Sequence, residues 1–374
     1  MRAVSVMLKP SSSLCNMRCE YCFYHSLAAE RESPSHGLMS EDTLARTLSR
    51  AFEYADGAPV YLSFQGGEPL LSGKEFFLRA AELIRTLNTR GSRVSVGVQT
   101  NGTLLDDEWC KLFARQGWLV GLSLDGDRTR TSHRIFADGS PAFDAICAGA
   151  KLLQKNRTEF NVLSVLTRPV ADNIERVWAF FRKNGFRHLQ FIPVLKPLPR
   201  PADVTEAKGR EAADGSLPDT AEWALTEQSY LNFLKKAFSL YMKDMIDGRY
   251  TSVRLFDNFV RLANFGRAEQ CGMGGSCSQQ FVVEGDGATY PCDFYCLDEY
   301  CLGNVHGMSF AEMEESERAK RFLAESAEKE ERCKSCKYAR LCGGGCKRER
   351  IDLDKCEAHK AFFEYALPHM KRMS

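Results

Sequence analysis

The sequence lacks a net charge of one sign, a long apolar run and an export signal. Its 50 lysine and arginine residues nearly balance its 49 aspartate and glutamate residues, so we expect neither nucleic acid nor an anionic membrane surface as a partner. No apolar stretch approaches the length that crosses a bilayer, and no signal peptide precedes the first apolar segment. We therefore expect a cytoplasmic protein.

Cysteine, in contrast, is abundant. The 374 residues include 15 cysteines, an odd number. In a long chain without an export signal, this count favours metal ligation over a disulfide framework. The length is sufficient for a large core and for two domains.

Residues 1 to about 195 alternate short apolar segments with helical stretches. The apolar segments are rich in β-branched and aromatic residues, as is typical of strands, and they lie at 4–8, 58–64, 93–99, 118–124, 160–166 and 187–192. The predicted helices between them lie at about 40–55, 74–88, 106–116, 141–155 and 171–184. Such alternation predicts an α/β fold with a parallel sheet. Six units are too few for a complete eight-stranded barrel, so we expect a partial barrel.

The first group of cysteines follows the first predicted strand. Cys15, Cys19 and Cys22 stand in CxxxCxxC spacing. Three thiolates can hold three irons of a four-iron cluster, whose fourth iron then has an open position for a substrate or cosubstrate. A zinc site is the alternative, because His25 could supply the fourth ligand that zinc normally takes.

Polar and glycine residues follow the next three predicted strands, as QGGEP at 65–69, QTNG at 99–102 and SLDG at 123–126. In a barrel of parallel strands, such strand ends carry the chemistry. The two glycines allow close approach to a ligand, and Glu68 can accept hydrogen bonds from an ammonium group. The Ser123 hydroxyl could bind a carboxylate. Each motif alone could be an ordinary turn, but their recurrence indicates a site.

Three further side chains are candidates for this site. The guanidinium fork of Arg134 fits a carboxylate, with a solvated surface arginine as the alternative. Tyr24 and Gln65 lie close to the cysteine group and the glycine motif, so they could line a substrate pocket. Core packing is the alternative for Tyr24.

A second cysteine array occupies the last third of the chain. Its eight thiols suit two four-iron clusters with four ligands each, but two structural zinc sites would use the same number. The array consists of Cys271, Cys277, Cys292, Cys333, Cys336, Cys342, Cys346 and Cys356.

Together, these motifs resemble the radical S-adenosylmethionine (SAM) superfamily and its SPASM subgroup, which modifies peptides and proteins. Within the superfamily, the sequence is most similar to the anaerobic sulfatase-maturating enzymes. The similarity rests on CNMRCEYCFYHS at 15–26, FQGGEP at 64–69, QTNGTL at 99–104 and CDFY at 292–295. It implies a partial (β/α)6 TIM-like barrel at 1–225, a helical connector at 226–265, and a cysteine-rich SPASM domain with a C-terminal helix at 266–374.

The resemblance also implies the cofactors, which are SAM and three 4Fe–4S clusters. Cys15, Cys19 and Cys22 would hold the cluster whose open iron binds SAM. The implied SAM contacts are Tyr21, Gly66, Gly67, Glu68, Gln99, Ser123 and Arg134. One auxiliary cluster would use Cys271, Cys277, Cys292 and Cys346. The other would use Cys333, Cys336, Cys342 and Cys356.

The implied reaction is the oxidation of a cysteine or serine of a sulfatase polypeptide to Cα-formylglycine. A 5′-deoxyadenosyl radical would remove a hydrogen atom from Cβ, and Asp293 would act as the base, with a turn carboxylate as its alternative. An electron donor such as ferredoxin or flavodoxin is implied as a partner. Two other functions stay open, namely a SPASM enzyme that crosslinks a ribosomal peptide and a non-catalytic zinc scaffold. The sequence shows no leader-binding domain ahead of Cys15, which favours the sulfatase-maturating function.

The remaining features carry weaker predictions. A proline-rich stretch at 193–220 indicates a loop or linker, and a helix is predicted at 226–247 with an apolar stripe that faces the core. Cys110 and Cys147 are predicted to be small buried hydrophobes, and Cys296 and Cys301 to be spare thiols. The extra thiols and the insertion depart from the family pattern, which leaves the choice of peptide substrate open.

Overall fold

One ten-stranded sheet organises the protein, whose computed structural model describes residues 2–196 and 222–373. The strand order is β10-β9-β8-β1-β2-β3-β4-β5-β6-β7. The six predicted strands are all present, and each pairs in parallel with its neighbour in sequence. They are β1 (Val4–Leu8), β2 (Val60–Phe64), β3 (Val94–Thr100), β4 (Leu119–Ser123), β5 (Phe160–Leu166) and β6 (His188–Pro193).

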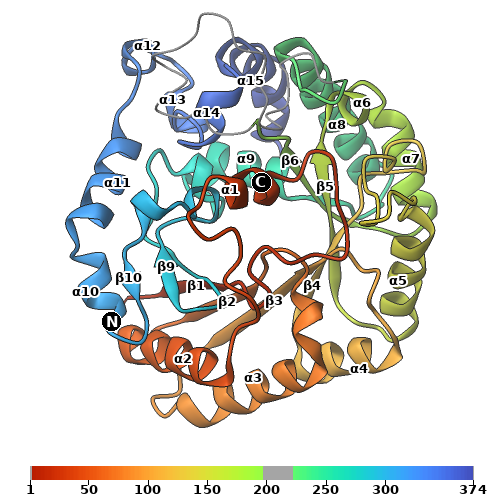
Figure 1. Cartoon of the computed structure of the whole chain (residues 1–374). Coiled ribbons are helices and arrows are strands. Elements are labelled where there is room, and N and C mark those ends of the chain that lie inside the picture. The colour runs from red at the N-terminus through yellow and green to blue at the C-terminus, as the bar shows by residue number, and fades with distance from the viewer. Residues whose placement is uncertain (1, 197–221, 374) are drawn as a thin grey trace, which may run out of the picture.

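Helices connect these strands and lie on the outer side of the curved sheet (Figure 1). They are α2 (Glu41–Ala55), α3 (Gly73–Leu87), α4 (Asp107–Gln116), α5 (Phe143–Lys155), α6 (Arg168–Asp172) and α7 (Ile174–Lys183). Ser40 is the N-cap of the first of them, since its side chain accepts a hydrogen bond from the Thr43 amide at 3.1 Å. The helix predicted at 171–184 is present as α7, but it begins three residues later, at Ile174. The separate short helix α6, which Thr167 caps and which has Pro169 in its first turn, ends at Asp172.

The six strands do not close into a barrel, because each edge strand, β1 and β6, pairs with a further strand. β6 pairs with the short strand β7 (Ser252–Val253), and β1 pairs in parallel with β8 (Phe281–Val283). β8 continues through antiparallel β9 (Ala288–Tyr290) to β10 (Gly303–Asn304). The cysteine-rich region therefore begins as an extension of the barrel sheet. The sequence analysis did not predict these strands.

An aromatic core joins the C-terminal helix to the connector helices. α8 (Glu227–Ile246) buries the predicted stripe, including Phe233 and Phe238, which confirms that prediction. Phe362 of α15 (Cys356–Met370) packs against Phe238 and against Phe259 of α9 (Arg254–Phe265). The shorter helices are α1 (Phe23–Ala29), α10 (Phe310–Glu314), α11 (Glu317–Ala327), α12 (Glu331–Lys334), α13 (Ala339–Cys342) and α14 (Glu349–Asp352).

Most of the proline-rich stretch at 193–220, which is predicted to be a loop or linker, lies outside the described residues. Across 2–196 and 222–373, no helix combines the length and the apolar character that a membrane span needs. The division at residues 225 and 265 stays a prediction, since one sheet runs through the first and last of the three proposed units.

Candidate active site

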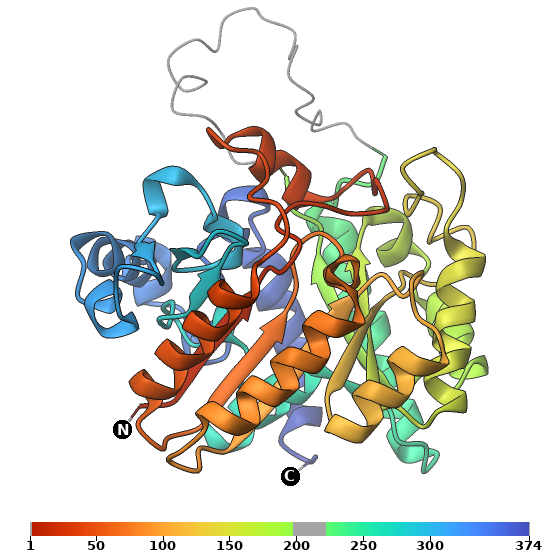
Figure 2. The same cartoon turned by 60° about the horizontal axis from the view of Figure 1, so that its bottom comes forward.

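The loop with the first three cysteines joins β1 to α1 at the end of the sheet to which the strands point (Figure 2). The glycine motif after β2 forms backbone hydrogen bonds with this loop. The Gly67 amide donates to the Ser12 carbonyl and the Glu68 amide to the Leu14 carbonyl, both at 2.8 Å. A Cβ atom at Gly67 would overlap the Leu14 carbonyl oxygen, and Gly66 has a φ of +115°. Both glycines are therefore required by the packing of the loop, whatever they contribute to cofactor binding.

Glu68 is fully buried and ties two motifs together. Its carboxylate accepts hydrogen bonds from the Leu70 amide at 3.1 Å, the Thr100 hydroxyl at 2.8 Å and the Asn101 amide at 2.8 Å. Burial raises the pKa of Glu68 to about 7, and these hydrogen bonds act in the opposite direction. The observed role of Glu68 is to fix the turn after β3 against the glycine motif, and its contact with SAM stays a prediction.

A buried network fixes the second half of the cysteine loop. Arg134 donates to both carboxylate oxygens of Asp125 at 2.9 Å, and the Tyr21 hydroxyl donates to the same carboxylate. Arg134 is 6% exposed, so the alternative of a solvated surface arginine is wrong. Asp125 also accepts from the Val165 amide at 2.8 Å, which connects the network to β5. Because Tyr21 lies between Cys19 and Cys22, the network holds that part of the loop.

Gln99 and Ser123, from the neighbouring strands β3 and β4, lie together at the same end of the sheet. The Gln99 side-chain amide donates to the Ser123 hydroxyl at 2.9 Å. Of the predicted SAM contacts, Gly67 and Glu68 thus contact the cysteine loop through their amides, whereas Gln99 and Ser123 contact each other, and binding of SAM by any of them stays a prediction. Gln65 is half-buried, and its backbone amide donates to the Leu8 carbonyl at 2.9 Å.

The three cysteines of the loop lie within electrostatic reach of one another. Burial, together with the charges on Glu68, Cys19 and Cys22, raises the pKa of Cys15 to about 12. Burial likewise raises the pKa of Cys19 to about 11. Each of these thiols therefore resists ionisation on its own. A cationic metal cluster would act in the opposite direction, because it favours the thiolate forms of its ligands.

Asp293 and Tyr24 meet across the interface between the barrel and the cysteine-rich region. The Tyr24 hydroxyl donates to Asp293 Oδ2 at 2.5 Å, while the buried Oδ1 has no hydrogen-bond partner among the described residues. Burial raises the pKa of Asp293, although the nearby charge of Lys9 and the bond from Tyr24 act to lower it. A carboxylate held by one oxygen and unpartnered at the other can accept a proton at a defined atom.

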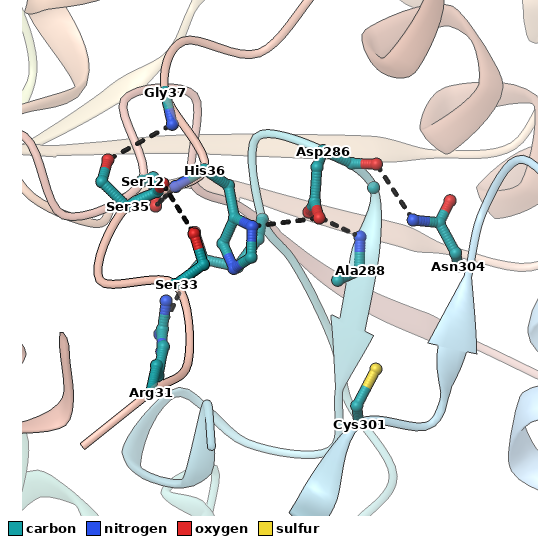
Figure 3. Close-up of polar contacts among 12 residues, drawn as sticks. Ser12, Arg31, Ser33, Ser35, His36, Gly37, Asp286, Ala288, Cys301 and Asn304 are labelled. Atoms are coloured by element: carbon teal, nitrogen blue, oxygen red, sulfur yellow. Dashed lines mark hydrogen bonds and ion pairs between the residues drawn. The ribbon is translucent and has the colours of Figure 1, made fainter. Parts of the chain in front are cut away.

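A buried ion triad lies beside Asp293. Lys9 and Arg31 each approach Glu284 Oε1 at 2.8 Å, and all three side chains are at most 1% exposed. The same segment continues to His36, whose Nδ1 lies 3.0 Å from Asp286 Oδ2 (Figure 3). These contacts bind residues 31–37 to the turn between β8 and β9. Because the cysteine loop precedes this segment, the contacts also position that loop against the C-terminal region.

The eight cysteines of the second array form two groups in space. In the first group, Cys271 shares a hydrogen bond with Cys277. Burial raises the pKa of Cys292, and Cys346 raises it further. Burial also raises the pKa of Cys346, to which Glu349 and then Cys271 add. These mutual effects indicate that the four thiols lie near one another, and a Cβ atom built on Gly272, next to Cys271, would lie 3.1 Å from the Cys346 Cβ. Their assignment to one cluster stays a prediction.

The second group surrounds one pocket. Its empty space is about 360 Å³, and it is lined by Cys333, Cys336, Cys342 and Cys356 together with His359. Burial raises the pKa of Cys342, and charges on Cys333, Cys356 and Cys336 add to this shift. Four cysteines around one pocket are the donor set that a 4Fe–4S cluster requires.

Family models and relatives agree with this arrangement. The model of the Radical SAM superfamily matches residues 10–194, and that of the SPASM iron–sulfur cluster-binding domain matches residues 271–337. A cysteine-type anaerobic sulfatase-maturating enzyme of Clostridium perfringens strain 13 is 39% identical to this chain, over 99% of this chain and 98% of its own. This chain belongs to the anaerobic sulfatase-maturating enzymes.

Two further comparisons extend this family assignment. A serine-type anaerobic sulfatase-maturating enzyme of Bacteroides thetaiotaomicron is 30% identical, over 98% of this chain and 90% of its own. The solved structure of native anSMEcpe with bound AdoMet and Cp18Cys peptide superposes with a TM-score of 0.88 at 36% identity, and covers 100% of this chain and 99% of that one. The predicted fold, the radical SAM oxidoreductase class and the iron–sulfur SPASM domain are thereby confirmed.

The zinc alternatives find no support in the family or in the site. His25 is exposed, and within 2–196 and 222–373 no three His, Cys, Asp or Glu side chains converge closely enough to hold a single ion. A four-iron cluster spreads its ligands over separate irons, so its cysteines need not converge on one point. Of the cysteines outside the groups, Cys110 and Cys296 are buried, whereas Cys147 is half-exposed, contrary to prediction.

Several residues of this site were not predicted from the sequence. Asp125 stands inside the SLDG motif, and Asn101 inside QTNG, so the motifs contained a signal for both. Nothing local marked Lys9, Glu284 or His359, because their partners lie far away in the chain.

Proposed function

We propose that this protein converts a cysteine of a sulfatase polypeptide into Cα-formylglycine. Three cysteine-type enzymes are 36% to 39% identical to the chain, whereas the serine-type enzyme of Bacteroides thetaiotaomicron is 30% identical. The observation that carries the proposal is the pairing of Asp293 with Tyr24, which leaves one buried carboxylate oxygen without a partner in the part of the chain that the structure describes.

The chain offers a donor set for each cofactor. Cys15, Cys19 and Cys22 would hold the cluster that binds SAM, and the two groups of the second array would hold the auxiliary clusters. When bound, these groups supply a 5′-deoxyadenosyl radical that removes a hydrogen atom from the substrate Cβ, and an acceptor for the remaining electron. Gln99, Ser123 and Arg134 are the side chains that would contact SAM, and the guanidinium of Arg134 is also the partner of Asp125.

The base in this proposal is Asp293. It takes the thiol proton of the substrate at Oδ1 while the hydrogen atom and the electron leave, which gives a thioaldehyde. Water then hydrolyses the thioaldehyde to the aldehyde, and the sulfur leaves as hydrogen sulfide. Tyr24 holds Oδ2 and so fixes the orientation of the carboxylate. Burial raises the pKa of Asp293 and makes it a stronger base than an exposed aspartate.

The buried charges around Asp293 favour its ionised form before reaction. Lys9 and Arg31 carry two positive charges, and Glu284 carries one negative charge. An ionised Asp293 completes a neutral group of four. The charge of Lys9 acts to lower the pKa of Asp293, which limits the increase caused by burial.

We further place the protein in a reducing cytoplasm with a small redox protein, such as ferredoxin or flavodoxin, as electron donor. All fifteen cysteines lie within the described residues, and each is a free thiol. Free thiols are what cluster ligation and a reducing compartment require.

Mass spectrometry of a sulfatase-derived peptide tests the proposal. Reconstituted enzyme, SAM and reductant should convert the cysteine form of the peptide to the aldehyde faster than the serine form. An Asp293→Asn variant should lose at least about 100-fold in aldehyde formation, within the usual range for a general base, while it still releases 5′-deoxyadenosine. Asp298→Asn, which changes an exposed aspartate of the next turn, is the matched control and should keep full activity.

Other outcomes have distinct meanings. Deoxyadenosine without any change in either peptide would reject a sulfatase substrate in favour of another peptide. Full aldehyde formation by the Asp293→Asn variant would reject Asp293 as the base but leave the substrate assignment intact.

A further inference from the structure

The ring of His359 connects two side chains that belong to different parts of the fold. Its Nδ1 lies 3.4 Å from the Cys342 sulfur, and its Nε2 lies 3.2 Å from the Tyr230 hydroxyl. Two rings flank the imidazole, with centroid distances of 6.2 Å to Phe259 and 5.7 Å to Phe363. The ring is thus held in place from α8, α9 and α15.

His359 faces the pocket lined by the second group of cysteines, and is half-buried there. A cysteine that ligates iron is a thiolate, which accepts hydrogen bonds but cannot donate them. Nδ1 of His359 must then carry the proton that it shares with Cys342. The other ring nitrogen is left as an acceptor, and the Tyr230 hydroxyl is placed to donate to it. Tyr230 is 3% exposed and therefore has little competing water.

We propose that His359 donates a hydrogen bond to the Cys342 sulfur and thereby raises the reduction potential of the auxiliary cluster held by Cys333, Cys336, Cys342 and Cys356. Reduction adds negative charge to a cluster, and a donor aimed at a ligand sulfur stabilises that charge. Tyr230 acts through His359 rather than on the sulfur itself. Its hydroxyl donates to Nε2 of His359 and so favours the tautomer with a proton on Nδ1. His359 is a positioning residue in this proposal, which rests on the proposed ligand set.

The test is a spectroscopic redox titration of the reconstituted full-length enzyme under anaerobic conditions. To resolve the auxiliary signals, it is repeated in a background where Cys15, Cys19 and Cys22 are alanine. His359→Phe should lower the equilibrium constant for reduction of one auxiliary cluster about tenfold, equivalent to about 59 mV for one electron. The other auxiliary potential should not change.

Two conservative variants test whether the shift in potential comes from the lost hydrogen bond or from lost packing. His359→Gln retains an N–H donor and should restore part of the shift. Tyr230→Phe removes the donor to Nε2 and should shift the same potential in the same direction by less. His369→Phe is the control, because His369 contacts the Tyr365 ring near the end of α15 and should leave both potentials unchanged.

The outcomes separate this proposal from the ligand assignment. If His359→Phe binds iron fully and both potentials equal those of the parent, the proposal is overturned. If His359→Phe loses iron, an unchanged potential in both His359→Gln and Tyr230→Phe overturns it. If Cys342→Ala retains all its iron and both auxiliary signals, the ligand set itself is wrong.

Discussion

Replacing Asp125 by asparagine tests whether a buried ion pair holds the cysteine loop in position. The change removes the charge that faces Arg134 while it preserves the shape of the side chain. Arg134 is 6% exposed and Asp125 is fully buried, so water cannot compensate the uncovered guanidinium. Removal of one partner from a buried pair costs about 3–5 kcal/mol.

The expected change in melting temperature follows from chain length. With about 2.1 cal/mol/K of unfolding entropy per residue, 374 residues correspond to about 0.8 kcal/mol/K. The apparent melting temperature of Asp125→Asn should therefore fall by about 4–6 °C, by scanning calorimetry at one fixed scan rate. Because Tyr21 loses its anchor as well, iron retention at the first cluster and SAM cleavage should decrease together.

Asp144→Asn is the matched control for this measurement. Asp144 pairs with Arg128 at the surface, and their side chains are 75% and 61% exposed. An exposed pair contributes at most about 1 kcal/mol, so this variant should melt within about 1 °C of the parent. If Asp125→Asn melts as high as Asp144→Asn, the buried network does not stabilise the loop.

Two further substitutions probe the supports of the same loop. Gly67→Ala should lower the free energy of unfolding by about 1–3 kcal/mol and reduce the iron content, because its methyl group would overlap the Leu14 carbonyl. Gly307→Ala is the control, because open space surrounds Gly307. It should change neither quantity when unfolding and iron content are measured in parallel. Asp286→Asn should lower the melting temperature more at pH 6 than at pH 8.5. The Asp286 carboxylate accepts a hydrogen bond from the His36 ring and thereby raises the pKa of His36. The stability that the pair contributes is therefore complete below the unfolded pKa of about 6.5 and is lost as pH rises through the folded value. Equal effects at both pH values would contradict a charged pair.

The sequence by itself determined the parts of the protein that depend on neighbours in the chain. Strands and helices of the barrel follow from local periodicity, so all six strands and most helices were predicted within a few residues. The first three cysteines and the glycine motif follow from short spacings. Even so, the sequence could not show why Gly67 must be glycine, since its close neighbour Leu14 belongs to another segment.

Tertiary structure alone decided what meets across the sheet. β8 has three residues, too few for a periodic signal, yet its pairing with β1 brings the second cysteine array to the barrel. Tyr24 and Asp293 form their hydrogen bond across 269 positions, and His359 reaches Tyr230 across 129. No local pattern encodes such contacts, because they depend on how whole elements pack. Metal ligation by the cysteines could therefore be predicted from their spacing and number, whereas the orientation of the base and the surroundings of the second auxiliary pocket could not.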